Sequence, residues 1–193
     1  MSVAMRTRLA AVGGTAALAA TTVLVAAPAA EAKPASVKST YSCQTDFGAQ
    51  DVGVTTTMVL PAKVKKGKKV PSKPVKLLVV IPEGLTTLMR GVGITSLSGS
   101  ASGVKASVGT TKVAVKGVKF PATTVPASGA MKIKASGTAA AFKIKKVGTY
   151  TVSIPKKFNF TAKDQNGNAL LNNAPCTVVK GSPTKIGKLK VVK

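Results

Sequence analysis

The chain contains no histidine and no tryptophan, and only 4% of its 193 residues are aromatic. The absence of histidine removes the side chain that most often serves as a general base near neutral pH. Acidic residues are also scarce. The chain has 5 Asp and Glu and 29 Lys and Arg. Paired catalytic carboxylates or a set of metal ligands would have to come from these few scattered acids. The composition therefore predicts a protein that is not an enzyme and that needs no metal or cofactor.

Serine–lysine chemistry is the one catalytic alternative that the composition allows. The spacing Ser-x-x-Lys occurs at Ser102/Lys105, Ser153/Lys156 and Ser182/Lys185. None of the three opens a predicted helix, and the companion motifs of the serine–lysine penicillin-binding enzymes are missing. A chain this rich in lysine also produces the spacing by chance, so we do not expect catalysis from it.

The first 32 residues have the layout of a secretory signal peptide. Arg6 and Arg8 supply a positive start, residues 9–25 are apolar and rich in alanine, and Ala30-Glu31-Ala32 fits a cleavage site. A membrane anchor is the alternative, but glycines and threonines dilute the apolar stretch. We therefore expect a secreted protein with no membrane span after cleavage, either extracellular or loosely associated with the cell wall.

Net charge is the strongest compositional signal. Without residues 1–32 the chain keeps 27 basic and 4 acidic residues, a net charge of about +23. Such a chain is attracted to polyanions. Lysines outnumber arginines 26 to 3, and lysine acts as a hydrated point charge rather than as a bidentate ligand of phosphate. The charge therefore predicts diffuse, salt-sensitive attraction and no sequence-specific recognition of nucleic acid.

Cys43 and Cys176 are the two cysteines of the chain. An even number of cysteines in an exported protein favours a disulfide, because the compartment is oxidising. A zinc site is the alternative, but no histidine and no clustered acids could complete it. A bond between the two cysteines would join a strand near the start of the domain to one near its end.

The densest apolar run outside the first thirty residues is Val75 to Pro82. Its five consecutive apolar residues, 77–81, are too few for a membrane span and predict a central strand buried on both faces. After this run, apolar residues recur at helical spacing. They are Leu85, Leu88, Met89 and Val92. We predict one short helix over residues 82–91, with glycines at 91 and 93 to end it.

The rest of the domain alternates apolar and polar residues over short stretches. The clearest stretches are 41–47, 51–60, 112–116, 131–134, 142–145, 150–154, 158–160, 176–179 and 188–192. Alternation of period two is typical of strands with one buried face. We expect residues 33–40 to be a mobile lead-in and residues 41–193 to be a single domain. Many short strands with one helix predict an all-β protein, specifically an immunoglobulin-like β-sandwich.

Several short motifs carry a resemblance to a known family. They are Tyr41-Ser42-Cys43, the helix running into Ser98-Gly99-Ser100-Ala101, Val125-Pro126-Ala127-Ser128-Gly129 before a Lys-x-Lys strand, and Ala174-Pro175-Cys176. Together they resemble an immunoglobulin-like domain of unknown function from secreted and surface proteins of actinobacteria. The resemblance implies a sandwich fold, export and a bond between Cys43 and Cys176. It implies no catalytic residues.

The densest cluster of lysines lies in the loop before the central strand. Its members are Lys63, Lys65, Lys66, Lys68, Lys69 and Lys73. Further lysines face outward on predicted strands at Lys112, Lys116, Lys132, Lys134, Lys143 and Lys145. The loop is the best local contact for an anionic cell-wall polymer or another polyanion. The alternative is a solvated loop whose charge keeps neighbouring strand edges from pairing.

The few aromatic side chains give no stacking surface for bases or sugars, because their positions fall on the apolar side of the predicted strands. They are Phe120, Phe142, Tyr150, Phe158 and Phe160. The leading hypothesis is a secreted, non-enzymatic protein of the cell envelope with a structural or adhesive role. The alternative is a dedicated polyanion-binding protein that uses the loop lysines. A protein partner stays open.

Overall fold

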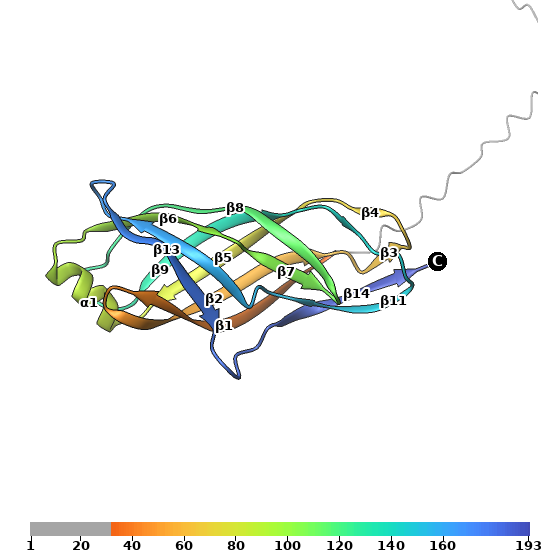
Figure 1. Cartoon of the computed structure of the whole chain (residues 1–193), viewed down its shortest axis with the longest axis horizontal. Coiled ribbons are helices and arrows are strands. Elements are labelled where there is room, and N and C mark those ends of the chain that lie inside the picture. The colour runs from red at the N-terminus through yellow and green to blue at the C-terminus, as the bar shows by residue number, and fades with distance from the viewer. Residues whose placement is uncertain (1–31) are drawn as a thin grey trace, which may run out of the picture.

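The computed structural model describes residues 32–193, so the predicted signal peptide lies outside the described residues except for its last position. The described chain is all-β apart from one short helix (Figure 1). The elements are β1 (Lys33–Thr45), β2 (Gly48–Leu60), β3 (Lys63–Lys65), β4 (Lys69–Val70), β5 (Lys73–Ile81), α1 (Glu83–Gly91), β6 (Ser96–Ser102), β7 (Lys105–Val108), β8 (Thr111–Thr124), β9 (Met131–Ala139), β10 (Phe142–Lys143), β11 (Gly148–Ser153), β12 (Lys157–Lys163), β13 (Ala169–Val178) and β14 (Lys185–Val192).

Eight of these strands form a closed antiparallel barrel. Around the barrel the order is β8, β6, β12, β13, β1, β2, β5, β9, and β9 pairs back to β8. The longest seam joins β1 to β2 over thirteen residue pairs, and β5 pairs with β9 over nine. The closing seam pairs Val115 of β8 with Ala139 of β9. Hydrogen bonding between strands therefore runs around the full circumference.

The barrel shows that the predicted immunoglobulin-like β-sandwich is wrong. A sandwich keeps two sheets face to face, whereas here the seam between β8 and β9 closes the sheet on itself. Alternation of period two cannot separate the two architectures, because both bury every second side chain. Closure depends on a sharp local bend of the sheet, which we call the corner. It lies where the register between β8 and β9 shifts, between Lys116 and Lys119. Opposite this corner, a Cβ on Gly137 would lie 2.7 Å from Val118 Cγ2, so a larger residue would force the seam apart.

The remaining strands extend the sheet at the end of the molecule that carries the C terminus (Figure 1). β7 pairs with the first half of β8, and β11, β14 and β3 follow in that order. β4 pairs with β10 in a separate small sheet. Leu189 and Val191 of β14 are 1% exposed and pack into the same core as Val37 and Met58 of the barrel. This end is therefore closely packed by its own side chains.

The predicted helix is confirmed as α1. Gly93 follows it with φ +77°, a conformation that glycine adopts without strain and that ends the helix. No helix within residues 32–193 is long and apolar enough to cross a membrane.

The predicted central strand is confirmed as β5, but it is not buried on both faces. Val75 and Ile81 are buried, whereas Lys76 on the opposite face is exposed because that face forms the outside of the barrel.

Residues 33–40 correct a further prediction. Instead of a mobile lead-in they form the first part of β1 and pair with the second half of β2, from Lys33 opposite Leu60 to Thr40 opposite Gly53. Val37 and Ser39 are buried, at 9% and 2% exposed. The hydrogen bonds to β2 and this burial together fix a segment whose polar composition alone suggested mobility.

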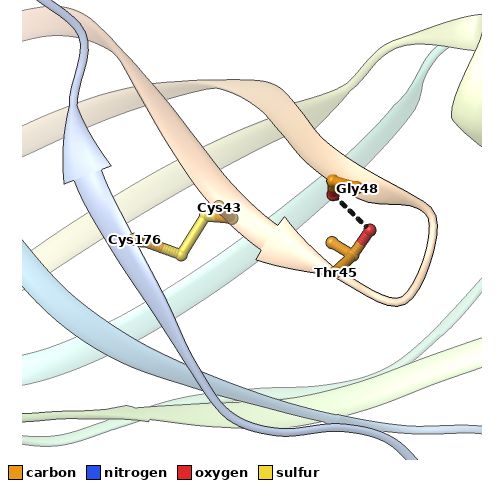
Figure 2. The surroundings of a disulfide bond; sticks show 4 residues. All are labelled: Cys43, Thr45, Gly48 and Cys176. Atoms are coloured by element: carbon orange, nitrogen blue, oxygen red, sulfur yellow. Dashed lines mark hydrogen bonds between the residues drawn. A yellow bond between two sulfur atoms is a disulfide. The ribbon is translucent and has the colours of Figure 1, made fainter.

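The predicted disulfide between Cys43 and Cys176 is confirmed. The two cysteines lie directly opposite each other on β1 and β13 (Figure 2). This seam is short, because pairing runs only from Tyr41 opposite Val178 to Cys43 opposite Cys176. The bond closes a loop of 133 residues, for which the chain-entropy argument gives up to about 5 kcal/mol. The disulfide therefore holds the barrel together at one of its shortest seams.

Candidate functional site

The interior of the barrel contains an elongated apolar cavity of about 380 Å³. Its wall consists of the inward-facing side chains of the barrel strands, for example Val75, Leu77, Val79 and Ile81 on β5. The six-residue step from Val75 to Ile81 corresponds to about 20 Å along the strand. With the strand tilt usual in such barrels, this is about 15 Å along the barrel axis. The space suits a chain-like molecule better than a round one.

Several inward side chains of the barrel are too small to fill it. Ala101, Ala106 and Ala135 all line the cavity, and Phe120 and Phe160 stack on each other, with ring centroids 5.7 Å apart, rather than spreading across it. An eight-stranded barrel is just wide enough either to be filled by its own side chains or to hold one small ligand. Protein interiors are otherwise packed as densely as organic crystals. The scarcity of aromatic residues thus has a structural consequence, an unfilled interior.

The cavity wall offers little hydrogen bonding. Tyr41 lines the cavity, but its hydroxyl donates to the carbonyl oxygen of Pro155 at 2.6 Å, and burial raises the pKa of this phenol. Within residues 32–193 every buried side-chain nitrogen and oxygen has a hydrogen-bond partner. Asp46 is the single charged residue among those that line the cavity in the described part of the chain. The cavity can therefore hold an apolar, uncharged group without leaving polar atoms unpaired.

We call the end of the cavity beside α1 the mouth. Leu85, Met89 and Val92 form one apolar stripe of the helix and line the cavity there. Phe47, in the turn between β1 and β2, and Leu170, at the start of β13, complete the mouth. Phe47 is 54% exposed and Val92 is 61% exposed although both line the cavity, so the apolar interior reaches the surface at this point.

Side-chain hydrogen bonds fix α1 over the mouth. The hydroxyl of Thr86, which is fully buried, donates to the carbonyl oxygen of Gly129 at 2.8 Å. The backbone N–H of Gly129 donates to Glu83 Oε1 at 3.0 Å, and Arg90 Nη1 donates to the carbonyl oxygen of Pro126 at 2.7 Å. These contacts tie both ends of the helix to the loop between β8 and β9.

A second hollow opens beside the mouth, at the seam between β1 and β13. Pairing of the two strands stops at Cys43 and Cys176, and beyond the disulfide the residues 44–46 and 169–172 line a hollow of about 370 Å³. Thr45 and Leu170 line both the hollow and the cavity. Figure 2 shows the bond between the two strands and the hydrogen bond from Thr45 Oγ1 to the carbonyl oxygen of Gly48, 2.8 Å, that closes the turn beyond it. The wall of the cavity is therefore interrupted on this side of the mouth.

The loop lysines predicted to bind polyanions lie at the opposite end of the molecule. Five of them are exposed, whereas Lys73 is half-buried at the start of β5. The fold brings them close to lysines far away in the sequence, because β3 pairs with β14, with Lys63 opposite Lys190, and β4 pairs with β10, with Lys69 opposite Lys143. We call this cluster the basic end. It consists of Lys63, Lys65, Lys66, Lys68, Lys69, Lys143, Lys145, Lys146, Lys188 and Lys190.

The outward lysines predicted on the strands are exposed, but they are not all brought together. Lys143 and Lys145 belong to the basic end, whereas Lys112 and Lys116 lie on β8 and Lys132 and Lys134 lie on β9. The aromatic side chains face inward as expected. Phe120 is buried, and Phe142, Tyr150, Phe158 and Phe160 are half-buried and pack against the core.

The acidic residues gather around the mouth. Asp46 lies in the turn between β1 and β2, Asp51 on β2, Glu83 on α1, and Asp164 in the hairpin between β12 and β13. The hairpin touches the segment after α1, since Gln165 Nε2 donates to the carbonyl oxygen of Gly93. Although desolvation acts to raise the pKa of Asp164, hydrogen bonds from Asn168 and from neighbouring backbone N–H groups lower it below its usual value. The mouth is therefore acidic and the opposite end basic.

The exposed lysines and the disulfide follow from the sequence, whereas the cavity and the clustering of the acids do not. One signal of the cavity was present, namely the many alanines and valines at inward positions of an aromatic-poor chain. The acids gave no signal, because they are spread from position 46 to position 164 and meet only in the folded barrel.

A closed eight-stranded barrel with an apolar interior that reaches the surface at one end defines a small β-barrel with room for a ligand. The chain belongs to a family of unknown function (DUF6801), which matches residues 40–187. This membership confirms the predicted domain of unknown function, while its immunoglobulin-like character is wrong. No curated protein and no solved structure matches the chain.

Proposed function

We propose that the protein binds a small apolar ligand inside its barrel and that this binding, not catalysis, is its function. The observation that carries the proposal is the apolar cavity of about 380 Å³ that reaches the surface at the mouth. Ligand pockets typically have volumes of about 300 to 1,000 Å³. An engineered apolar cavity of about 150 Å³ already suffices to bind benzene. The barrel therefore has room for a considerably larger molecule.

The lining restricts the class of ligand. Because no lysine or arginine lines the cavity among the described residues, an anionic group inside it would lose its hydration without gaining a partner. A ligand with a long apolar part and an uncharged end fits both the lining and the elongated shape. Apolar burial then supplies the affinity, since each methylene group removed from water contributes about 0.8 kcal/mol.

Titration of the protein with N-phenyl-1-naphthylamine, an uncharged apolar dye that fluoresces when it leaves water, tests the proposal. Ala135 lines the cavity, and Ala135→Phe should fill part of it and weaken dye binding about tenfold or more. Its neighbour Ser136 faces outward, so Ser136→Phe is the matched control and should leave the affinity unchanged. Thermal melting of both variants checks the fold. Absence of dye binding by the unaltered protein, or equal binding by Ala135→Phe, would contradict the proposal.

The basic end supports a second candidate function, attachment to a polyanion. Ten lysines from three separate segments gather there, and none of the four acids in residues 32–193 lies among them. Like charges brought together in this way repel one another, and a polyanion would relieve the repulsion. We propose an anionic cell-wall polymer or another polyanion as the partner. Such a partner requires export, which the predicted signal peptide in residues 1–32 would provide. Attachment of this kind would give the protein its adhesive role at the cell envelope.

Co-sedimentation with actinobacterial cell walls tests this attachment. Binding should fall steeply between about 50 and 500 mM salt and should disappear when anionic polymers are stripped from the walls. Replacement of the six loop lysines by glutamine should weaken it strongly. The control variant replaces six exposed lysines elsewhere, Lys119, Lys132, Lys134, Lys156, Lys157 and Lys163, and so has the same net charge. Equal losses in both variants would show that total charge, not the basic end, is responsible.

A further inference from the structure

We propose that the mouth docks on an uncharged lipid surface and that the cavity takes up its ligand from that surface. The inference rests on the proposed function, because it assumes that the cavity holds an apolar ligand. It adds the surface of the protein that makes contact and the chemistry of the partner.

Exposed apolar side chains are concentrated at the mouth. Among the described residues four large apolar side chains are exposed, and three of them, Phe47, Leu88 and Val92, surround the mouth. We call these three residues the rim. The fourth, Val147, lies next to β11 at the basic end. A contiguous exposed apolar region in a protein with few such residues marks a contact surface.

The rim is continuous with the cavity. Leu85, Leu88, Met89 and Val92 recur at helical spacing on α1, so that Met89 points into the cavity while Leu88 remains outside at 49% exposed. The hydrogen bonds of Thr86 and Arg90 hold the helix in this orientation. An apolar chain that leaves a lipid layer at the rim would thus meet apolar side chains all the way into the barrel.

The interrupted seam gives such a chain a path. Thr45, Asp46, Leu170 and Leu171 line both the cavity and the hollow between β1 and β13. Strand pairing is already absent there, so a ligand can pass without breaking hydrogen bonds of the barrel. The disulfide next to the hollow limits how far the seam can open.

Charge selects the kind of lipid surface. Four segments surround the mouth, namely 44–51, 82–96, 121–131 and 164–175. They contain all four acids of residues 32–193 and one base, Arg90, while Lys132 and Lys163 directly adjoin them. The other described residues contain 26 lysines and no acid. An anionic surface would repel the mouth and attract the opposite end, whereas a surface without net charge allows the rim to dock.

Flotation with phosphatidylcholine vesicles, which carry no net charge, tests the inference. We would work at about 0.5 M salt, where attraction by the lysines is largely screened. The unaltered protein should float with the vesicles. The variant Phe47→Ser/Leu88→Ser/Val92→Ser should bind them at least about a hundredfold more weakly, since each buried large apolar side chain contributes about tenfold. Val147→Ser, which removes the exposed apolar side chain at the basic end, should bind as the unaltered protein does.

Leu88 separates docking from ligand binding, because it belongs to the rim but does not line the cavity. Leu88→Lys should weaken vesicle binding about tenfold and leave the affinity for the dye unchanged. Dye binding by the unaltered protein without vesicle binding would overturn the docking inference and leave the proposed function intact. Equal vesicle binding by the rim variant and the unaltered protein would also overturn it. Absence of dye binding would reject the proposed function itself.

Discussion

The core of the barrel is covered differently at its two ends. At the basic end, additional strands cover the barrel, and Leu189 and Val191 are 1% exposed. At the mouth, one short helix stands over the opening, the interior is hollow, and apolar side chains are exposed. The charges differ along the same axis, because ten of the 26 lysines gather at the packed end and the four acids of residues 32–193 lie around the hollow end. The packed end thus has the features of a scaffold, and the hollow end has those of a binding site.

Loss of the disulfide should lower the stability most, and it should affect the mouth more than the basic end. Cys43→Ala/Cys176→Ala removes a bond that closes 133 residues, and we expect the free energy of unfolding to fall by about 2 to 5 kcal/mol. Urea unfolding with and without reductant measures the loss. Because the bond lies in the seam beside the mouth, hydrogen exchange should accelerate in β1 and β13 more than in β11 and β14. Uniform acceleration throughout the barrel would argue against two distinct ends.

Truncation of one leucine in the packed end and of one in the cavity wall compares packing directly. Leu189→Ala should cost about 3 kcal/mol, because it creates a new void in a closely packed core. Leu77→Ala should cost only about 1 kcal/mol, since Leu77 already borders the cavity and loses fewer contacts. Chemical denaturation of both variants under the same conditions gives the difference. Equal losses would show that the interior at Leu77 is as well packed as that at Leu189.

Detachment of α1 should lower the free energy of unfolding less than loss of the disulfide or Leu189→Ala. Its main effect should be faster entry of a ligand through the mouth. Thr86→Val keeps the shape of the side chain but leaves the carbonyl oxygen of Gly129 without its partner, at a cost of about 1 to 2 kcal/mol. Thr138→Val is the control, because Thr138 is exposed on β9 and takes no part in the contacts of α1. The rate at which the dye enters the cavity, measured by stopped-flow fluorescence, should rise in Thr86→Val alone. An unchanged rate would show that α1 does not limit access.

Removal of the Asp164 carboxylate from the hairpin beside the mouth should have the smallest effect on stability. This effect depends on pH. The folded-state pKa of Asp164 is lowered, so its contribution is present above the unfolded-state pKa, near 3.8, and is lost as the pH falls through the folded value. The melting temperature of Asp164→Ala should therefore lie slightly below that of the unaltered protein at pH 7, and the two should converge at low pH. A difference that persists at a pH at which the carboxyl group is protonated in both states would attribute the effect to something other than the carboxylate.

Local features of the fold could be predicted from the sequence because their causes are local. The strands follow from the alternation around Val113 and Ile133, and α1 follows from the spacing of Leu85, Met89 and Val92. The disulfide follows from an even cysteine count in a chain with an export signal. Each of these inferences uses residues that are close in sequence or a simple count.

Closure and the binding site could not be predicted, because both depend on which strands become neighbours. The corner at Gly137 closes the barrel, but a glycine between alternating residues looks the same in a sandwich. The mouth combines Phe47, α1 and Leu170, which no sequence window contains together. The basic end was predicted only in part, since the pairing of Lys63 with Lys190 and of Lys69 with Lys143 enlarges a cluster that the loop merely begins.

The ten lysines at the basic end and the four acids around the mouth give the molecule an electric dipole along the barrel. Near an anionic surface the field would exert a torque on it within about one Debye length, roughly 8 to 10 Å at physiological salt, before any atoms touch. The lysines would turn toward the surface and the mouth would turn away from it. A protein attached in this way presents its opening to the space beyond, where an apolar molecule or a second, uncharged surface can reach it.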